Sequence, residues 1–157
     1  MRFLGLISLL LAATPLALAK PTKQPKPNCP PRKVSQKEQR EIFDKFVKTF
    51  WLDKTPPIAF ANHVDENYIQ HNPNALSGRQ VAIDTFAKMN MDSITYTILN
   101  KGFDDNVGWV HYKMEMPGLP QPYAVVDTVR FEGSCIMEHW DVSQMRPANS
   151  INPIAMW

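Results

Sequence analysis

The feature that most constrains this chain is a change in the spacing of its apolar residues near Ser93. Before this point apolar residues recur every three or four positions, which is the spacing of one face of a helix. After it they alternate with polar residues, as in strands that have one buried face. Helices followed by a run of strands predict an α+β fold, in which a curved antiparallel sheet packs on a layer of about three helices.

The first predicted helix begins with a capping box, in which Ser35 precedes Glu38 by three positions. A short second helix follows Pro56-Pro57, because proline is tolerated in the first turn of a helix, and we expect it to end near Asn67. The apolar face of the first helix consists of residues at helical spacing: Ile42, Phe43, Phe46, Val47, Phe50 and Trp51.

A second capping pattern, Ser77 with Gln80, predicts a third helix over about 78–90. Turn-forming residues then separate the alternating segments at 102–106 and at Gly133-Ser134, with a longer loop at 117–121. These boundaries predict four strands, over about 93–101, 107–116, 122–132 and 135–145.

The first 19 residues have the pattern of a signal peptide. Arg2 precedes an apolar run over 3–18, and the small residues Ala17 and Ala19 stand where signal peptidase requires them. An uncleaved membrane anchor is the alternative, although the run is short for a bilayer span and contains Pro15. We therefore expect a secreted protein that follows the secretory pathway and has no membrane attachment after cleavage.

The next segment, 20–34, is rich in proline and lysine and is expected to be an extended leader. Residues 35–157 have the length of one domain. An oxidising compartment would favour a disulfide between Cys29 and Cys135, and two separate thiols are the alternative. Neither arrangement has the close cysteine pairing of a zinc site, so no metal is expected.

Charge and motifs exclude several classes of function. The chain has 17 basic and 15 acidic residues, and four of the lysines lie in the leader, so the folded part has no basic field and nucleic-acid binding is disfavoured. The sequence contains no nucleophile elbow and no glycine-rich phosphate loop. Any chemistry would therefore be acid–base chemistry, and no cofactor is expected.

Asp127 is the first candidate for that chemistry, because its strand places it on a face that is otherwise strongly apolar and should point inward. A carboxyl group in such surroundings is pushed toward its neutral form and could donate a proton. A two-residue turn at Gly133-Ser134 would pair Asp127 with Trp140, Val129 with Glu138 and Phe131 with Ile136.

The partners of Asp127 depend on the strand registers, which the sequence leaves open. His111 could lie beside Asp127 and form an acid–base pair with it, and a histidine satisfied on the sheet is the alternative. His71, which follows the second helix, is a further candidate. A β-bulge in the last strand would exchange its faces, so that His139 and Asp141 would point inward.

Aromatic residues could form the wall of a pocket beside these groups. Tyr68, Trp109 and Trp140 are the candidates for substrate contacts, and Glu138 would share their side of the sheet. A role for the aromatic residues in the core is the alternative.

Three segments carry a family resemblance: Tyr68-Ile69-Gln70-His71-Asn72-Pro73 followed by Gly78, the strand 126–131, and the segment 138–144. Together, over about 36–146, they resemble the SnoaL-like polyketide cyclase family within the nuclear-transport-factor-type superfamily. The resemblance implies a cone-shaped, curved sheet with a pocket between helices and sheet, and a homodimer through the sheet. The segment 127–131 also resembles a strand of ketosteroid isomerases that supplies a protonated Asp, although the other residues of that site are not evident.

The leading hypothesis is a cofactor-independent acid–base enzyme that acts on a polyketide-like or other small apolar molecule by ring closure, isomerisation or epoxide opening. A secreted carrier that uses the same pocket without catalysis is the alternative. A third interpretation, an interaction protein that uses its outer sheet face, is favoured if Trp109 and Trp140 fill the pocket. In the leading hypothesis the catalytic residues are Asp127, His111 and His71.

Overall fold

A computed structural model describes residues 26–157. The predicted signal peptide and the first part of the leader lie outside the described residues. No helix within 26–157 is long and apolar enough to cross a membrane. The elements are α1 (Gln36–Val47), the π-helical turn η1 (Lys48–Leu52), α2 (Pro56–His63), β1 (Val64–Gln70), α3 (Arg79–Phe86), the 3₁₀ turn η2 (Met91–Ser93), β2 (Thr95–Asp104), β3 (Val107–Glu115), β4 (Tyr123–Glu132) and β5 (Cys135–Met145).

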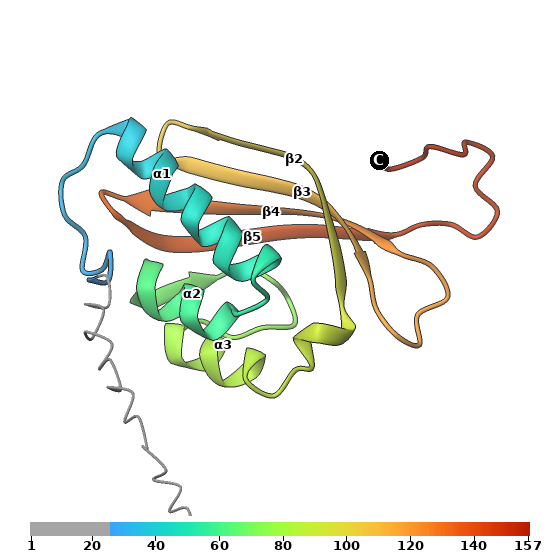
Figure 1. Ribbon diagram of the computed structural model, residues 1–157, viewed down its shortest axis with the longest axis horizontal. Helices are drawn as coiled ribbons and strands as arrows, with labels where there is room; N and C mark the ends of the chain where they lie inside the picture. Colours follow the sequence, from blue (N-terminus) through green and yellow to red (C-terminus); the bar gives the residue numbers. More distant parts are fainter. Residues whose placement is uncertain (1–25) are drawn as a thin grey trace, which may run out of the picture.

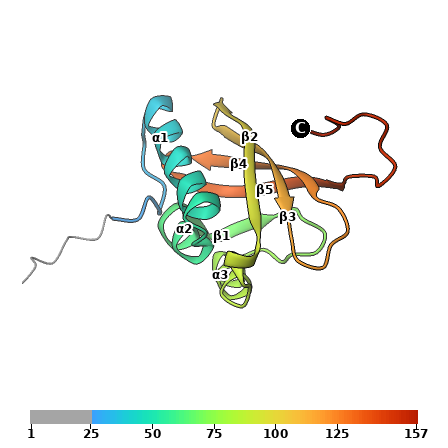
Figure 2. The same ribbon diagram turned by 45° about the vertical axis from the view of Figure 1, so that its right-hand side comes forward.

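The strands form one sheet in the order β1-β5-β4-β3-β2. β1 pairs with β5 in parallel, and the other neighbouring strands are antiparallel. Helix α1 lies along the inner face of the sheet, and α2 and α3 lie together near β1 (Figures 1 and 2). The predicted α+β fold, helices first and strands after, is therefore confirmed, with one added parallel strand.

The start of α1 and its buried face are as the sequence predicts. The Ser35 hydroxyl accepts a hydrogen bond from the backbone N–H of Glu38, at 3.2 Å. The apolar face of α1 and η1 packs against the inner side chains of β3, β4 and β5. The core therefore includes Ile42, Phe43, Phe46, Val47, Phe50 and Trp51 on the helical side and Val110, Val125, Val129, Phe131 and Ile136 on the sheet.

The predicted second helix is too long, because its last residues belong to a strand. Helix α2 ends at His63, and β1 follows immediately at Val64, where the prediction continued the helix to Asn67. Val64 and Tyr68 are buried, and the backbone of β1 pairs with β5. Pairing with a distant strand therefore overrides the helical spacing that these residues also satisfy.

The third helix is shorter than predicted at its C-terminal end, and its predicted N-terminal cap serves another purpose. The Ser77 hydroxyl accepts a hydrogen bond from the backbone N–H of Gln70, at 3.1 Å, and does not cap the helix. Helix α3 begins at Arg79, after Gly78, and ends at Phe86. The four predicted strands 93–101, 107–116, 122–132 and 135–145 correspond to β2, β3, β4 and β5.

A β-bulge in β5 changes the predicted pairing of β4 with β5. The pair Phe131–Ile136 is confirmed, but Met137 is an extra residue, and the next pair is Arg130–Glu138. From there on, Val129 lies opposite His139 and Asp127 opposite Asp141. The predicted pairs of Asp127 with Trp140 and of Val129 with Glu138 are wrong, because one inserted residue reverses the faces of the strand beyond it.

The leader is attached to the β4–β5 turn. Cys29 forms a disulfide with Cys135, as one of the two alternatives predicted, with a Cα–Cα distance of 5.0 Å. The Ser134 hydroxyl accepts from the N–H of Arg32 and donates to the carbonyl of Asn28. At Gly133, where φ is 52°, a Cβ would clash with the Arg32 carbonyl oxygen, so this close approach requires glycine.

Candidate active site

A pocket of about 420 Å³ lies between the helices and the inner face of the sheet. The lining is mostly aromatic and aliphatic, and its apolar part includes Phe46, Phe50, Trp51, Phe60, Phe86, Met89, Ile94, Met114 and Met116. Its polar side chains include Tyr68, Gln70, Asn72, Tyr96, Tyr112, Asp127, His139 and Asp141. Small-molecule sites typically combine such an apolar wall with a few placed polar groups.

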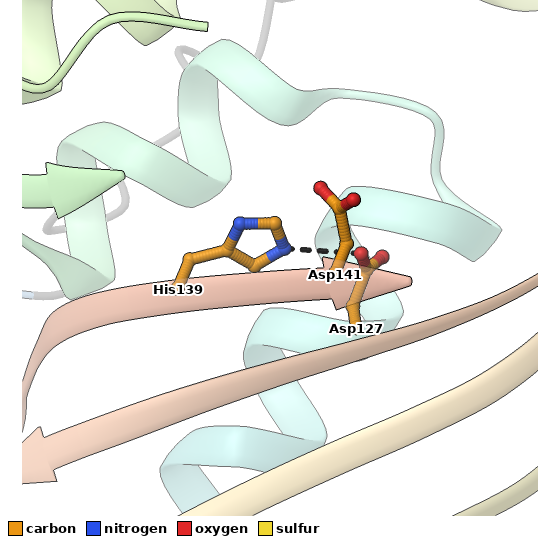
Figure 3. Close-up of side chains that lie close together, drawn as sticks. All are labelled: Asp127, His139 and Asp141. Carbon is orange, nitrogen blue, oxygen red and sulfur yellow. Dashed lines mark hydrogen bonds and ion pairs between the residues drawn. The ribbon is translucent and has the colours of Figure 1, made fainter. Parts of the chain in front are cut away.

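Asp127 and His139 form an acid–base pair at this pocket. The His139 Nε2 atom lies 3.0 Å from Asp127 Oδ1, and the Asp127 side chain is 9% exposed. The Tyr112 hydroxyl donates to the other carboxyl oxygen, Oδ2, at 2.8 Å. Figure 3 shows Asp127, His139 and Asp141 projecting to the same side of the sheet.

The end of β1 orients the imidazole. Oε1 of Gln70 accepts from the backbone N–H of Asn72 at 2.9 Å and lies 2.8 Å from His139 Nδ1. Because a backbone N–H can only donate, Oε1 is an acceptor, and Nδ1 must therefore carry a proton. The amide group of Gln70 donates to the Tyr68 hydroxyl at 3.0 Å and so completes the orientation of this side chain.

Because Nδ1 carries a proton, a hydrogen bond between His139 Nε2 and Asp127 Oδ1 requires a second proton, which either atom can hold. Such a pair can both donate and accept a proton, which is the requirement for general acid–base chemistry.

A second carboxylate, Asp141, lies beside the pair. Its Oδ2 atom accepts from the Asn72 side-chain amide at 2.6 Å, and it forms no ion pair within residues 26–157. One potential ligand atom from each of Asp127, His139 and Asp141 lies within 4.8 Å of the others. Imidazole nitrogen and carboxylate oxygen are common metal ligands, so these are the side chains of the described chain that could hold a divalent cation, although the sequence led us to expect no metal.

Three tyrosines of the lining remain neutral over a wide pH range. Burial, together with the negative charge of Asp127, raises the pKa of Tyr112 well above its usual value and that of Tyr96 to about 12. Burial also raises the pKa of Tyr68, and the carboxylates of Asp127 and Asp141 add to the effect. These hydroxyls therefore remain available as hydrogen-bond donors, and Tyr112 uses its own to hold Asp127.

Asp127 and Tyr68 lie in the pocket lining, where the sequence placed them, but His111 does not. The register of β3 with β4 sets Val110 opposite Asp127 and His111 opposite Val126. The predicted position of His111 beside Asp127 is therefore wrong. Tyr112, which has the opposite parity in the strand, reaches Asp127 in its place.

The other predicted site residues lie on the outer face of the sheet. His71 Nε2 lies 3.3 Å from Glu138 Oε2, and its ring stacks on Trp140 at a centroid distance of 4.6 Å. Arg130 also pairs with Glu138. Trp109 and Trp140 are 39% and 37% exposed, so they do not fill the pocket, and the bulge accounts for the outward direction of Glu138 and Trp140.

His139 and Asp141 replace the two histidines that the sequence suggested. The alternative of a β-bulge names both residues, but no turn or composition signal at Met137 distinguishes it from a regular hairpin. Gln70 and Asn72 belong to the motif that carries the family resemblance, yet their contact with β5 depends on the parallel pairing of β1, which was not predicted.

No family model and no curated protein matches this sequence. Solved structures do resemble it. An NTF2-like protein of unknown function from Burkholderia xenovorans has a TM-score of 0.61 and 12% identity, over 73% of this chain and 89% of that one. A candidate polyketide cyclase from Bacillus cereus has a TM-score of 0.56 and 14% identity, over 73% of this chain and 87% of that one.

A third solved structure, the candidate hydroxylase AclR from Streptomyces galilaeus, has a TM-score of 0.54 and 13% identity. It covers 72% of this chain, which itself spans 93% of AclR. Identities this low are evidence about the fold and not about activity. The chain has the NTF2-like fold, as the resemblance to SnoaL-like proteins implied.

Proposed function

We propose that this protein is a cofactor-independent acid–base enzyme that acts on a polyketide-like or other largely apolar small molecule. The observation that carries the proposal is the contact of 3.0 Å between His139 Nε2 and Asp127 Oδ1 at an apolar pocket. His139 replaces His111 and His71 as the partner of Asp127.

The shared proton suits the three reactions expected from the sequence. Ring closure, isomerisation and epoxide opening each require a proton to be delivered to an oxygen and another to be removed from carbon or water. In its ionic form the pair offers an imidazolium as the donor and a carboxylate as the acceptor. A positioned group of this kind accelerates such a step by roughly 10²–10⁴-fold.

The fold and the leader support the remaining parts of the proposal. Structural neighbours that bear the names polyketide cyclase and hydroxylase favour an apolar, oxygenated substrate. The disulfide between Cys29 and Cys135 favours an oxidising compartment, in agreement with export along the secretory pathway. The exposed Trp109 and Trp140 are available for the sheet-mediated homodimer that the family resemblance implies.

The proposal can be tested with a small bicyclic ketone, 2-tetralone, whose protons next to the carbonyl group exchange in D₂O under acid–base catalysis. We expect the protein to accelerate this exchange, followed by ¹H NMR, and Asp127→Asn to reduce the acceleration by about 10²-fold or more. Asn preserves the shape of the side chain and can accept from Tyr112 and donate to a neutral His139, so the fold should survive.

His111→Gln is the matched control, since His111 lies on the other face of the sheet, and it should exchange 2-tetralone at the wild-type rate. Equal rates in wild type and Asp127→Asn would remove Asp127 from the mechanism. Binding of 2-tetralone without any acceleration of exchange would favour the carrier.

A further inference from the structure

We infer that the ligand of this pocket carries a protonated amine, which pairs with the Asp141 carboxylate. The inference deepens the proposed function, because it assigns a substrate class to the same pocket. It concerns binding, however, and it can be tested without turnover.

The polar cluster of the pocket is acidic. Asp127 and Asp141 are its two carboxyl groups, and His139 is the one basic side chain among the described lining residues. One imidazole can balance at most one carboxylate, so the cluster is negatively charged at neutral pH. The described residues that line the pocket include no lysine or arginine to balance this charge.

Asp141 has no ionic partner in the described part of the chain. Its Oδ2 atom accepts from the neutral amide of Asn72, and no cationic side chain within residues 26–157 pairs with it. In the free protein, water can solvate this partly buried carboxylate. A ligand that fills the pocket displaces that water, and a carboxylate that loses its hydration without a compensating partner is costly.

The wall of the pocket is largely aromatic. Phe50, Trp51, Phe60, Phe86 and Tyr96 are among its aromatic residues. Aromatic faces attract organic cations, and they also accommodate an apolar ligand body. A carboxylate without an ionic partner beside an aromatic wall therefore favours an amine with an aromatic or other apolar body, and it disfavours a carboxylate ligand.

The test compares three naphthalene probes that differ in one group: 2-naphthylmethylamine, 2-naphthylmethanol and 2-naphthoate. We expect calorimetric titration of the full chain at pH 7 to give an amine affinity at least about tenfold above that of the alcohol, with the naphthoate weakest. The alcohol serves as the neutral hydrogen-bond donor. Equal affinity of amine and alcohol, or no measurable binding of any probe, would overturn the inference.

Two variants locate the effect. Asp141→Asn can still accept from Asn72, and it should lower the amine-to-alcohol ratio to about one while the affinity for the alcohol is kept. Glu138→Gln removes a carboxylate from the outer face of the same strand and should keep the wild-type ratio. An unchanged ratio in Asp141→Asn would also contradict the inference. Because exchange of the neutral 2-tetralone needs no amine, the proposed function can stand if this inference fails.

Discussion

Two histidine–carboxylate pairs lie on opposite faces of β5, and they differ more in surroundings than in geometry. The nitrogen–oxygen distance is 3.0 Å in the inner pair, His139–Asp127, and 3.3 Å in the outer pair, His71–Glu138. The inner side chains are 16% and 9% exposed, and the outer ones are 40% and 18% exposed. Similar contacts therefore occur in a largely buried site and in a more exposed one.

The remaining partners of each pair separate them further. The inner pair is held by neutral donors and acceptors, the Tyr112 hydroxyl and the Gln70 amide. The outer pair includes Arg130, whose hydrogen bonds lower the pKa of Glu138 and stabilise a permanent carboxylate. A shared, movable proton is thus a property of the inner pair, and the identity of the residues alone does not distinguish the two.

His139→Gln is the most direct way to break this comparison, because it removes the imidazole of the inner pair and leaves the outer pair intact. Glutamine can still donate a hydrogen bond to Asp127. We expect the exchange of 2-tetralone protons to fall by about 10²-fold or more in this variant. His71→Gln, which alters the outer pair, should exchange at the wild-type rate. Equal rates in the two variants would mean that the pocket does not distinguish the inner pair from the outer one.

A third histidine sharpens the comparison, because His63 is buried and its ring contacts the Asn28 side-chain amide rather than a carboxylate. Burial first, and then Lys45, lowers the pKa of His63 to about 4. The unfolded chain therefore binds an extra proton between about pH 6.5 and pH 4, so stability should fall as the pH decreases through this window. The loss should be roughly 3 kcal/mol in urea unfolding at a series of pH values.

The variant His63→Gln should flatten this pH dependence, whereas His71→Gln on the outer face should retain it. The same slope in His63→Gln as in wild type would exclude His63 as its source.

Truncation of His139 and of His71 should lower the free energy of unfolding by different amounts. His139→Ala removes one hydrogen-bond partner each from the Asp127 carboxyl, which keeps Tyr112, and from the Gln70 amide oxygen, which keeps the N–H of Asn72. Because the site is largely buried, the loss should cost about 1–3 kcal/mol. His71→Ala removes an exposed pair and should cost about 0–1 kcal/mol. Urea unfolding midpoints at constant slope measure both, and equal losses would mean that burial does not distinguish the pairs.

The smallest expected effect concerns Glu138 at acid pH. Its pKa is lowered in the folded protein, chiefly by Arg130, so its contribution is present above the unfolded pKa and is lost as the pH falls through the folded value. Glu138→Gln should therefore reduce the loss of stability below about pH 4.5 by a small amount. An acid limb identical to that of wild type would show that this surface pair is energetically neutral.

The sequence predicts the fold well, because helical and alternating spacings are local properties. The capping box at Ser35 and the alternation in β3, β4 and β5 give the elements and their order. β1 is not predicted from the sequence, because Val64 and Tyr68 also suit a helix. Its pairing partner, β5, lies about 70 residues further along the chain.

The site is predicted less well, because its residues depend on register. Asp127 follows from parity within one strand, and Tyr68 from its motif. His139 and Asp141 point inward because of one extra residue at Met137, and His111 points outward because of the pairing across a long loop. Both registers are set by packing between distant segments rather than by the spacing of residues along a strand.

The link between Cys29 and Cys135 also determines what a protease could do to this protein. The two cysteines are 106 positions apart, so the chain between them forms a covalent ring that includes all three α-helices and four of the five strands. A single backbone cut within that ring, for example in the loop between β3 and β4, leaves both pieces joined. An extracellular protein built in this way would have to be cut twice within the ring before any piece of the ring could diffuse away.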